Sequence, residues 1–258
     1  MKLGMVIDLQ RCVGCGACAF ACKAENNTRD RDAEDGQSFN WADFLMKTEG
    51  KFPDTTHWVM PVLCNHCTDA ACVEVCPVKP NKAMYKTPEG ITMHDPSLCI
   101  GCRECQTACP YSSEELDATS LDGAAYSVIS YNSRYKSIQP RWADDKPLIA
   151  GVTASGAATA QKAGVPVPAM NVFESNDVGP LRKPRIVEKC TFCAHRTLNG
   201  MQPACVEACP SQARVFGDLD DASSAVAKIL QVKKTFVLKP EGGTRPNVYY
   251  VGKYSIRG

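Results

Sequence analysis

The chain has 258 residues, with 29 Lys and Arg against 28 Asp and Glu, so its formal net charge is only +1. This balance argues against a nucleic-acid or membrane-surface partner, and a hydrophobic content of 44% is ordinary for a packed interior. Its sixteen cysteines are unusual, and they leave three classes of protein: a disulfide scaffold, a zinc protein or an iron–sulfur protein.

The first half of the chain predicts short elements around the cysteines. Residues 3–7 are expected to form a strand that leads into the first cysteines, and residues 16–23 a short helix after them. Residues 26–50 carry mixed charges and are expected to be a solvated loop. Residues 57–62 resemble the end of a strand, and residues 83–94 predict a β-hairpin around their Pro-Glu-Gly turn.

The second half contains a long insertion and then closing elements. Residues 126–131 suggest another strand, whereas residues 133–188 are rich in Gly, Ala, Pro and Thr and predict an insertion that wraps the surface or contacts a partner. Residues 222–231 are expected to be a helix capped by the Asp pair before them. Residues 235–238 and 248–251 are expected to be strands.

The sixteen cysteines fall into four groups of four, with none left over. Pro follows the last cysteine of groups two, three and four, whereas Lys23 follows group one. Groups one and three share the spacing C-x2-C-x2-C-x3-C; they are Cys12, Cys15, Cys18 and Cys22, and Cys99, Cys102, Cys105 and Cys109. Group two has the spacing C-x2-C-x4-C-x3-C and consists of Cys64, Cys67, Cys72 and Cys76. Group four has the spacing C-x2-C-x11-C-x3-C and consists of Cys190, Cys193, Cys205 and Cys209.

These spacings favour iron–sulfur clusters over the other two classes. Cysteines two residues apart rarely pair as structural disulfides, and a disulfide scaffold suits a small domain without a core. Zinc prefers two C-x2-C pairs separated by a loop, a form that groups two and four could adopt but that groups one and three could not easily adopt. The run C-x2-C-x2-C-x3-C-P is the bacterial ferredoxin arrangement, so sixteen thiolates predict four [4Fe–4S] clusters.

In that arrangement the fourth cysteine of a group binds the other cluster of a pair. The short link between groups two and three predicts that they form one ferredoxin unit, which leaves groups one and four to pair with each other. The predicted ligands are those of site one (Cys12, Cys15, Cys18, Cys209), site two (Cys190, Cys193, Cys205, Cys22), site three (Cys64, Cys67, Cys72, Cys109) and site four (Cys99, Cys102, Cys105, Cys76).

The expected fold class is α+β, with two bacterial-ferredoxin-like modules. Residues 1–60 and 186–258 are expected to form the first module, with groups one and four and a C-terminal extension. Residues 61–132 are expected to form the second module, with groups two and three, and residues 133–185 a surface insertion that contacts a partner.

The chain carries no nucleotide-binding glycine motif, nucleophile elbow or metalloprotease histidine pair, so we assign no catalytic residue and expect no enzyme activity from it alone. His66 and His195 lie next to ligand cysteines and are expected to pack or hydrogen-bond around the clusters, since every site already has four cysteines. Two roles, raising the cluster potentials or solvating the surface, remain open for the basic residues beside the groups (Lys79, Arg103, Lys189, Arg196).

The order of the four groups, with the widened fourth, resembles the four-cluster iron–sulfur subunit of molybdopterin oxidoreductases of the dimethyl sulfoxide reductase type. Matching segments are residues 5–8, 63–67, 189–196, 217–221 and 238–241. The chain looks closest to the small subunits of respiratory arsenate, polysulfide and tetrathionate reductases, and to those of catechol dehydroxylases.

The resemblance implies a heterodimer that acts in anaerobic respiration. A large catalytic partner would hold a molybdenum or tungsten bis-pterin cofactor, and this chain would carry electrons between it and a membrane quinol-oxidising subunit or another donor. The order implied runs from site one, at the catalytic subunit, through sites two and three to site four. The alternative is a freestanding polyferredoxin-type carrier.

We expect a soluble chain without a secretory signal or a transmembrane segment. Its association with a membrane would then depend on partners. It would lie on the periplasmic side if the catalytic partner carries a twin-arginine signal, and in the cytoplasm otherwise.

Overall fold

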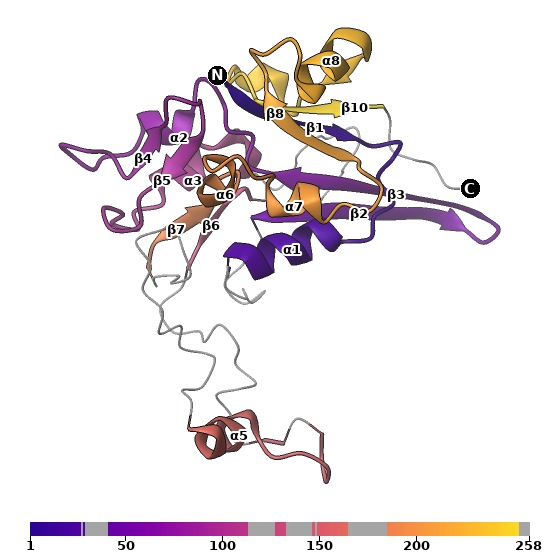
Figure 1. Ribbon diagram of the computed structural model, residues 1–258, viewed down its shortest axis with the longest axis vertical. Coiled ribbons are helices and arrows are strands. Elements are labelled where there is room, and N and C mark those ends of the chain that lie inside the picture. Colours follow the sequence, from indigo (N-terminus) through magenta and orange to yellow (C-terminus); the bar gives the residue numbers. More distant parts are fainter. Residues whose placement is uncertain are drawn as a thin grey trace.

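The computed structural model describes residues 1–26, 28, 41–112, 127–132, 146, 147, 149–164 and 185–252. In this part the chain is mixed α and β, as expected, with small sheets and mostly short helices (Figure 1). The charged residues 29–36 and most of the 133–185 insertion lie outside the described residues. No helix in the described part is long and apolar enough to cross a membrane.

The largest sheet joins the two ends of the chain. Its strand order is β8 (Arg214–Asp218), β1 (Leu3–Asp8), β10 (Val248–Val251) and β9 (Thr235–Phe236), which confirms the strands predicted at both ends. β1 is antiparallel to β8 and parallel to β10. Because strand side chains alternate between the two faces of a sheet, Met5 and Ile7 lie in the core that contains the cysteines, while Val6 lies on the opposite face of the sheet.

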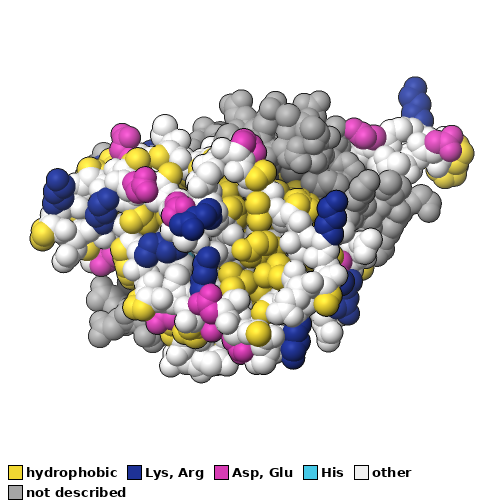
Figure 2. All heavy atoms as spheres, turned by 90° about the horizontal axis from the view of Figure 1, so that it is seen from above, with side chains coloured by type: hydrophobic (Ala, Val, Ile, Leu, Met, Phe, Trp, Pro, Cys, Tyr) yellow, Lys and Arg dark blue, Asp and Glu magenta, His cyan; other side chains and the backbone are white. Residues whose placement is uncertain are grey.

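That other face is covered by α8 (Ala225–Val232), where Val226 packs against the sheet. The predicted helix is confirmed, but its predicted cap is wrong. Ser224 caps it by accepting a hydrogen bond from the backbone N–H of Ala227 at 3.1 Å, whereas Asp221 accepts one from the N–H of Ser223. Figure 2 looks onto the side that carries α8, where hydrophobic side chains gather in the middle and both signs of charge are scattered around them.

A long hairpin replaces part of the predicted loop. β2 (Ala42–Lys51) pairs antiparallel with β3 (Asp54–Leu63), so the prediction of a solvated loop over residues 26–50 is wrong for its second half. The mixed charges that suggested a loop lie at residues 29–36, before β2 begins. The hairpin is buried at its base, at Met60 and Val62, and exposed towards its tip, at Glu49. The preceding helix, α1 (Ala17–Asn26), begins and ends slightly later than predicted.

Shorter elements surround the remaining cysteines. The predicted hairpin is confirmed as β4 (Met84–Lys86) and β5 (Thr92–His94). The strand expected near residue 131 is β6 (Ile129–Tyr131), which pairs with β7 (Val187–Lys189) across the expected module boundaries, while Tyr126 lies outside the described residues. The helices here are α2 (Ala71–Glu74), α3 (Glu104–Ala108), α6 (Ala194–Thr197) and α7 (Ala204–Glu207), with 3₁₀ turns η2 (Pro110–Ser112) and η3 (Pro240–Gly242).

The described part of the insertion contains a helix. α5 (Gly156–Ala163) begins at Ser155, whose hydroxyl accepts a hydrogen bond from the backbone N–H of Ala158 at 3.0 Å, and it ends at Gly164. Figure 1 shows α5 away from the other elements, so the helix takes no part in the core around the cysteines.

Candidate iron–sulfur cluster sites

The four cysteines predicted for site one line a single pocket at the start of α1, beneath the β2–β3 hairpin. Phe44 and Val59 of the hairpin and Arg214 of β8 complete its wall. Gly14 lets the cysteine loop lie against the hairpin, because it has a φ of +69° and a Cβ there would stand 2.7 Å from Val59. The cysteines in this pocket are Cys12, Cys15, Cys18 and Cys209.

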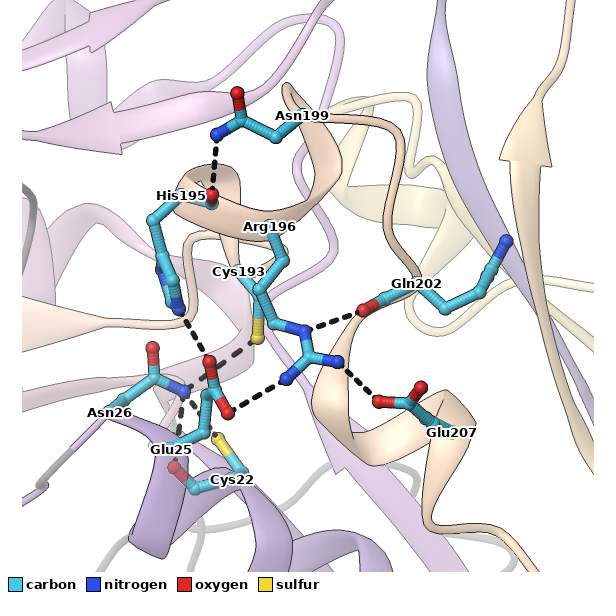
Figure 3. A network of polar contacts seen from close by, with 9 residues as sticks. All are labelled: Cys22, Glu25, Asn26, Cys193, His195, Arg196, Asn199, Gln202 and Glu207. Atoms are coloured by element: carbon cyan, nitrogen blue, oxygen red, sulfur yellow. Dashed lines mark hydrogen bonds and ion pairs between the residues drawn. The ribbon is translucent and has the colours of Figure 1, made fainter.

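The cysteines predicted for site two lie at α1, α6 and α7. Asn26, at the end of α1, donates from Nδ2 to the Sγ atoms of Cys22 at 3.6 Å and Cys193 at 3.7 Å (Figure 3). Its amide therefore joins a cysteine of group one to a cysteine of group four. Cys205 lies on α7, which packs against α1, and Cys190 follows β7 directly.

The other eight cysteines line two further pockets. The pocket of site three includes Tyr111 and Thr244, whose hydroxyl oxygens are 2.8 Å apart, and the pocket of site four includes Met84 and His94 from the β4–β5 hairpin. The cysteines are Cys64, Cys67, Cys72 and Cys109 in the first pocket, and Cys76, Cys99, Cys102 and Cys105 in the second.

Short helices distribute the ligands between neighbouring sites. α1 carries Cys18 of site one and Cys22 of site two, one helical turn apart. α1 packs against α7, and α2 packs against α3. α7, α2 and α3 divide their cysteines between two sites in the same way, with one cysteine in the helix and the next just after it. These pairs are Cys205 and Cys209 at α7, Cys72 and Cys76 at α2, and Cys105 and Cys109 at α3.

The cysteine pockets fit iron–sulfur clusters better than single ions. In the described part of the chain, which includes all sixteen cysteines, no three His, Cys, Asp or Glu side chains converge closely enough to hold one metal ion. Thiolates spread around a pocket suit a cubane, which is bound at its corners. Backbone N–H groups also donate to ligand sulfurs, from Gly101 to Cys99 at 3.4 Å, from Phe192 to Cys190 at 3.4 Å and from Ala213 to Cys209 at 3.3 Å.

Burial favours the protonated form of several of these thiols when no metal is bound. Burial, together with the neighbouring Cys64, raises the pKa of Cys67 to about 11 and that of Cys72 to about 12. Burial likewise raises the pKa of Cys22 and Cys190 well above the ordinary value. Binding of iron at these cysteines must therefore displace protons.

A polar network fastens α1 to the helices of group four (Figure 3). The Glu25 carboxylate lies 2.8 Å from Nε2 of His195 and 2.9 Å from Nη1 of Arg196, and Arg196 also pairs with Glu207. Burial would raise the pKa of Glu25, but the hydrogen bond from His195 and the charge of Arg196 lower it. His195 thus binds a carboxylate, and the charge of Arg196 is balanced by two carboxylates.

The other cysteine-flanking histidine, His66, joins the loops of sites two and three. Its ring stacks on Phe192 with a centroid distance of 3.6 Å, and its Nδ1 accepts a hydrogen bond from the backbone N–H of Thr92 at 3.2 Å. Burial, with the nearby charges of Lys189 and Lys86, holds the pKa of His66 well below its usual value, so the ring is neutral.

Two residues that contact ligand sulfurs, Asn26 and Arg214, were not predicted from the sequence. Asn26 was assigned to a loop, although it lies one turn after Cys22, a spacing that marks one helix face and would have identified it. Arg214 follows group four in an ordinary strand and carries no signal of its own, yet it is 3% exposed and donates to Cys18 Sγ at 3.3 Å.

Comparison with known proteins is consistent with this chemistry. The family described as a 4Fe-4S dicluster domain matches residues 55–125 and 176–219, and a 4Fe-4S binding domain matches residues 3–24. The arsenate respiratory reductase iron-sulfur subunit of Shewanella sp. (strain ANA-3) is 43% identical, covering 100% of this chain and 99% of that protein. A tetrathionate reductase subunit of Salmonella typhimurium is 30% identical, covering 97% and 72%. A selenate reductase subunit of Mesobacillus selenatarsenatis is 31% identical, covering 96% and 70%.

Proposed function

Because the chain belongs to the family of iron–sulfur electron-transfer subunits of molybdopterin reductases, we propose that its sixteen cysteines hold four [4Fe–4S] clusters at sites one to four. The observation that carries this proposal is the gathering of all sixteen thiols around the four sites, with no set converging on a single ion. A bound cluster supplies one-electron chemistry, and the chain sets its potential through burial, N–H···S bonds and charge.

The order of the sites follows from the elements that they share. Sites one and two share α1 and α7, and sites three and four share α2 and α3. Sites two and three meet where His66 stacks on Phe192. The proposed order is therefore one, two, three, four, within the two ferredoxin-like modules expected from the sequence.

Both ends of this order offer apolar surface. Next to site one, Cys15 and Val13 are exposed and Phe20 is 77% exposed, while next to site four Cys102 is exposed and Ile100 is 67% exposed. Exposed apolar side chains beside a redox centre suit a surface that a partner covers. We assign the site-one end to the large molybdopterin-containing subunit and the site-four end to the electron donor, such as a membrane quinol-oxidising subunit.

We expect the large subunit to determine the substrate of the complex. An arsenate reductase is our first choice, because the relative from an arsenate respiratory reductase matches over nearly its whole length, whereas the tetrathionate and selenate relatives are less identical and less fully covered. Respiratory reduction also fits the membrane quinol-oxidising partner that we assign to the site-four end.

Native anaerobic purification of the tagged chain tests this function. We expect a large molybdenum- or tungsten-containing subunit to copurify, and the dithionite-reduced clusters of the complex to be reoxidised by arsenate but not by buffer. Reoxidation by tetrathionate or selenate instead would change the substrate. A lone chain with four clusters and no large partner would refute the subunit assignment and favour a freestanding polyferredoxin carrier.

A further inference from the structure

Arg214 places a buried cation between sites one and two. Its side chain extends from β8 into the core and is 3% exposed. Nη2 donates to the Sγ of Cys18, a ligand of site one, at 3.3 Å, and Nη1 lies 3.9 Å from the Sγ of Cys205, a ligand of site two. One guanidinium therefore contacts ligands of two neighbouring sites.

The partners of this cation explain why it can be buried. A cation without a counter-charge costs several kcal/mol in a protein interior. The hydrogen bonds described for Arg214 all end on sulfur, the third on Met5 at 3.8 Å. Because a cubane with four thiolates is a net anion, both sites together compensate the charge.

Lys189 repeats this arrangement between sites two and three. The side chain is 1% exposed, and its Nζ donates to the carbonyl of Cys190, a ligand of site two, at 2.6 Å. Nζ also donates to the carbonyl of Thr92, which lines the pocket of site three. The ammonium is held by carbonyl groups, whose dipoles fix its place but do not cancel its charge.

We propose that Arg214 and Lys189 are redox-tuning residues, each a buried cation shared by two neighbouring clusters, that raise the reduction potentials of sites one, two and three; this rests on the proposed four-cluster function. Each reduction adds one electron to an anionic cluster, so a fixed positive charge in a low dielectric stabilises the reduced form. N–H···S bonds act in the same direction.

The shared positions predict a specific pattern. Site two borders both cations, sites one and three border one each, and the contacts of Arg214 and Lys189 described above do not include a ligand of site four. Removing the charge at Arg214 should thus lower the potentials of sites one and two, and removing it at Lys189 those of sites two and three. This pattern differs from a general loss of stability, which would affect all four sites without such order.

Redox potentiometry followed by electron paramagnetic resonance tests the pattern on the whole chain. The wild type must first show four one-electron clusters; if it does not, the proposed function fails, whatever the variants do. We then compare Arg214→Gln and Lys189→Gln with Arg214→Lys, which keeps the charge, and with Lys228→Gln, which removes a charge from the exposed surface of α8. Variants with a single replaced ligand cysteine assign each potential to its site.

We expect the reduction potentials of two neighbouring sites to fall in each of Arg214→Gln and Lys189→Gln. The potentials should shift less in Arg214→Lys and not at all in Lys228→Gln. Unchanged potentials in fully loaded Arg214→Gln and Lys189→Gln, or equal shifts at all four sites, would overturn the inference. A second measurement covers variants that fail to load clusters. Wild-type protein with ¹⁵N-labelled arginine should show nitrogen couplings by pulsed resonance at sites one and two that disappear in Arg214→Lys, and their absence from the wild type would overturn the role of Arg214.

Discussion

Replacing Gly101 with alanine should disrupt site four selectively. Gly101 lies between the ligands Cys99 and Cys102, has a φ of +71° and donates its backbone N–H to Cys99 Sγ. A Cβ at this position would stand 2.0 Å from the backbone carbonyl oxygen of Arg185. Real Cβ contacts essentially never fall below 3.0 Å, so the cysteine loop or the Arg185 backbone must move.

The free-energy cost of Gly101→Ala has two parts. Alanine in the left-handed region costs about 1 kcal/mol, and forcing atoms into a packed contact costs about 1–3 kcal/mol more. Gly200 supplies the matched control, because its φ is +77° and a Cβ there would meet nothing within 4 Å. We therefore expect Gly200→Ala to show only the first cost and Gly101→Ala about 3 kcal/mol.

The assay follows the visible absorbance of the clusters during heating at one fixed rate. One kcal/mol corresponds to about 2–4 °C in a chain of this size, so Gly101→Ala should lose its clusters about 6–12 °C below the wild type and Gly200→Ala about 2–4 °C below it. Isolated Gly101→Ala should also contain about 12 rather than 16 Fe per chain. Equal midpoints and equal iron contents in the two variants would refute the packing argument.

Three other outcomes follow from the described contacts. Asn26→Leu removes both N–H···S bonds and should lower the potential of site two in a redox titration, whereas Asn199→Leu, which loses a bond to a backbone carbonyl, should leave it unchanged; no shift at Asn26 would contradict this role. Tyr250→Phe removes a buried hydrogen bond to the Pro61 carbonyl at 3.0 Å and should cost about 1–2 kcal/mol, measured as a lower midpoint of cluster loss; an unchanged midpoint would contradict it. Because the pKa of Cys72 is raised by burial from 9.0 to about 12, the folded apoprotein keeps this thiol protonated while the unfolded chain ionises. Apoprotein stability should therefore fall as pH rises from 9.0 towards 12, a fall that a denaturant series should detect and that the loaded protein should not share.

The candidate sites follow from the cysteine spacing because a cluster requires several thiols at short, fixed separations, and these are visible in the sequence. The closing strands and the hairpin around residue 90 were equally visible, since alternating apolar residues and a turn signal are local features. The β2 strand was missed because the charges that suggested a loop lie at residues 29–36, before the strand begins, and the expected loop was extended over it.

Residues that act through distant contacts could not be found in this way. Arg214 reaches Cys18 from nearly two hundred positions away, because β8 pairs with β1 and α7, which contacts β8, packs against α1. Arg196 shows the converse, since a basic residue beside a cysteine suggested a tuning role, yet Glu25 and Glu207 balance its charge. Both outcomes depend on which carboxylates and sulfurs the fold brings close, and spacing alone does not contain that information.

The most direct test of the four-cluster assignment is the metal and acid-labile sulfide content of the anaerobically purified chain. The sixteen cysteines around four sites predict about 16 Fe and 16 sulfide per chain, with zinc at trace level. About 4 Zn per chain without sulfide would contradict the assignment, and so would about 8 Fe in a chain that retains all sixteen cysteines.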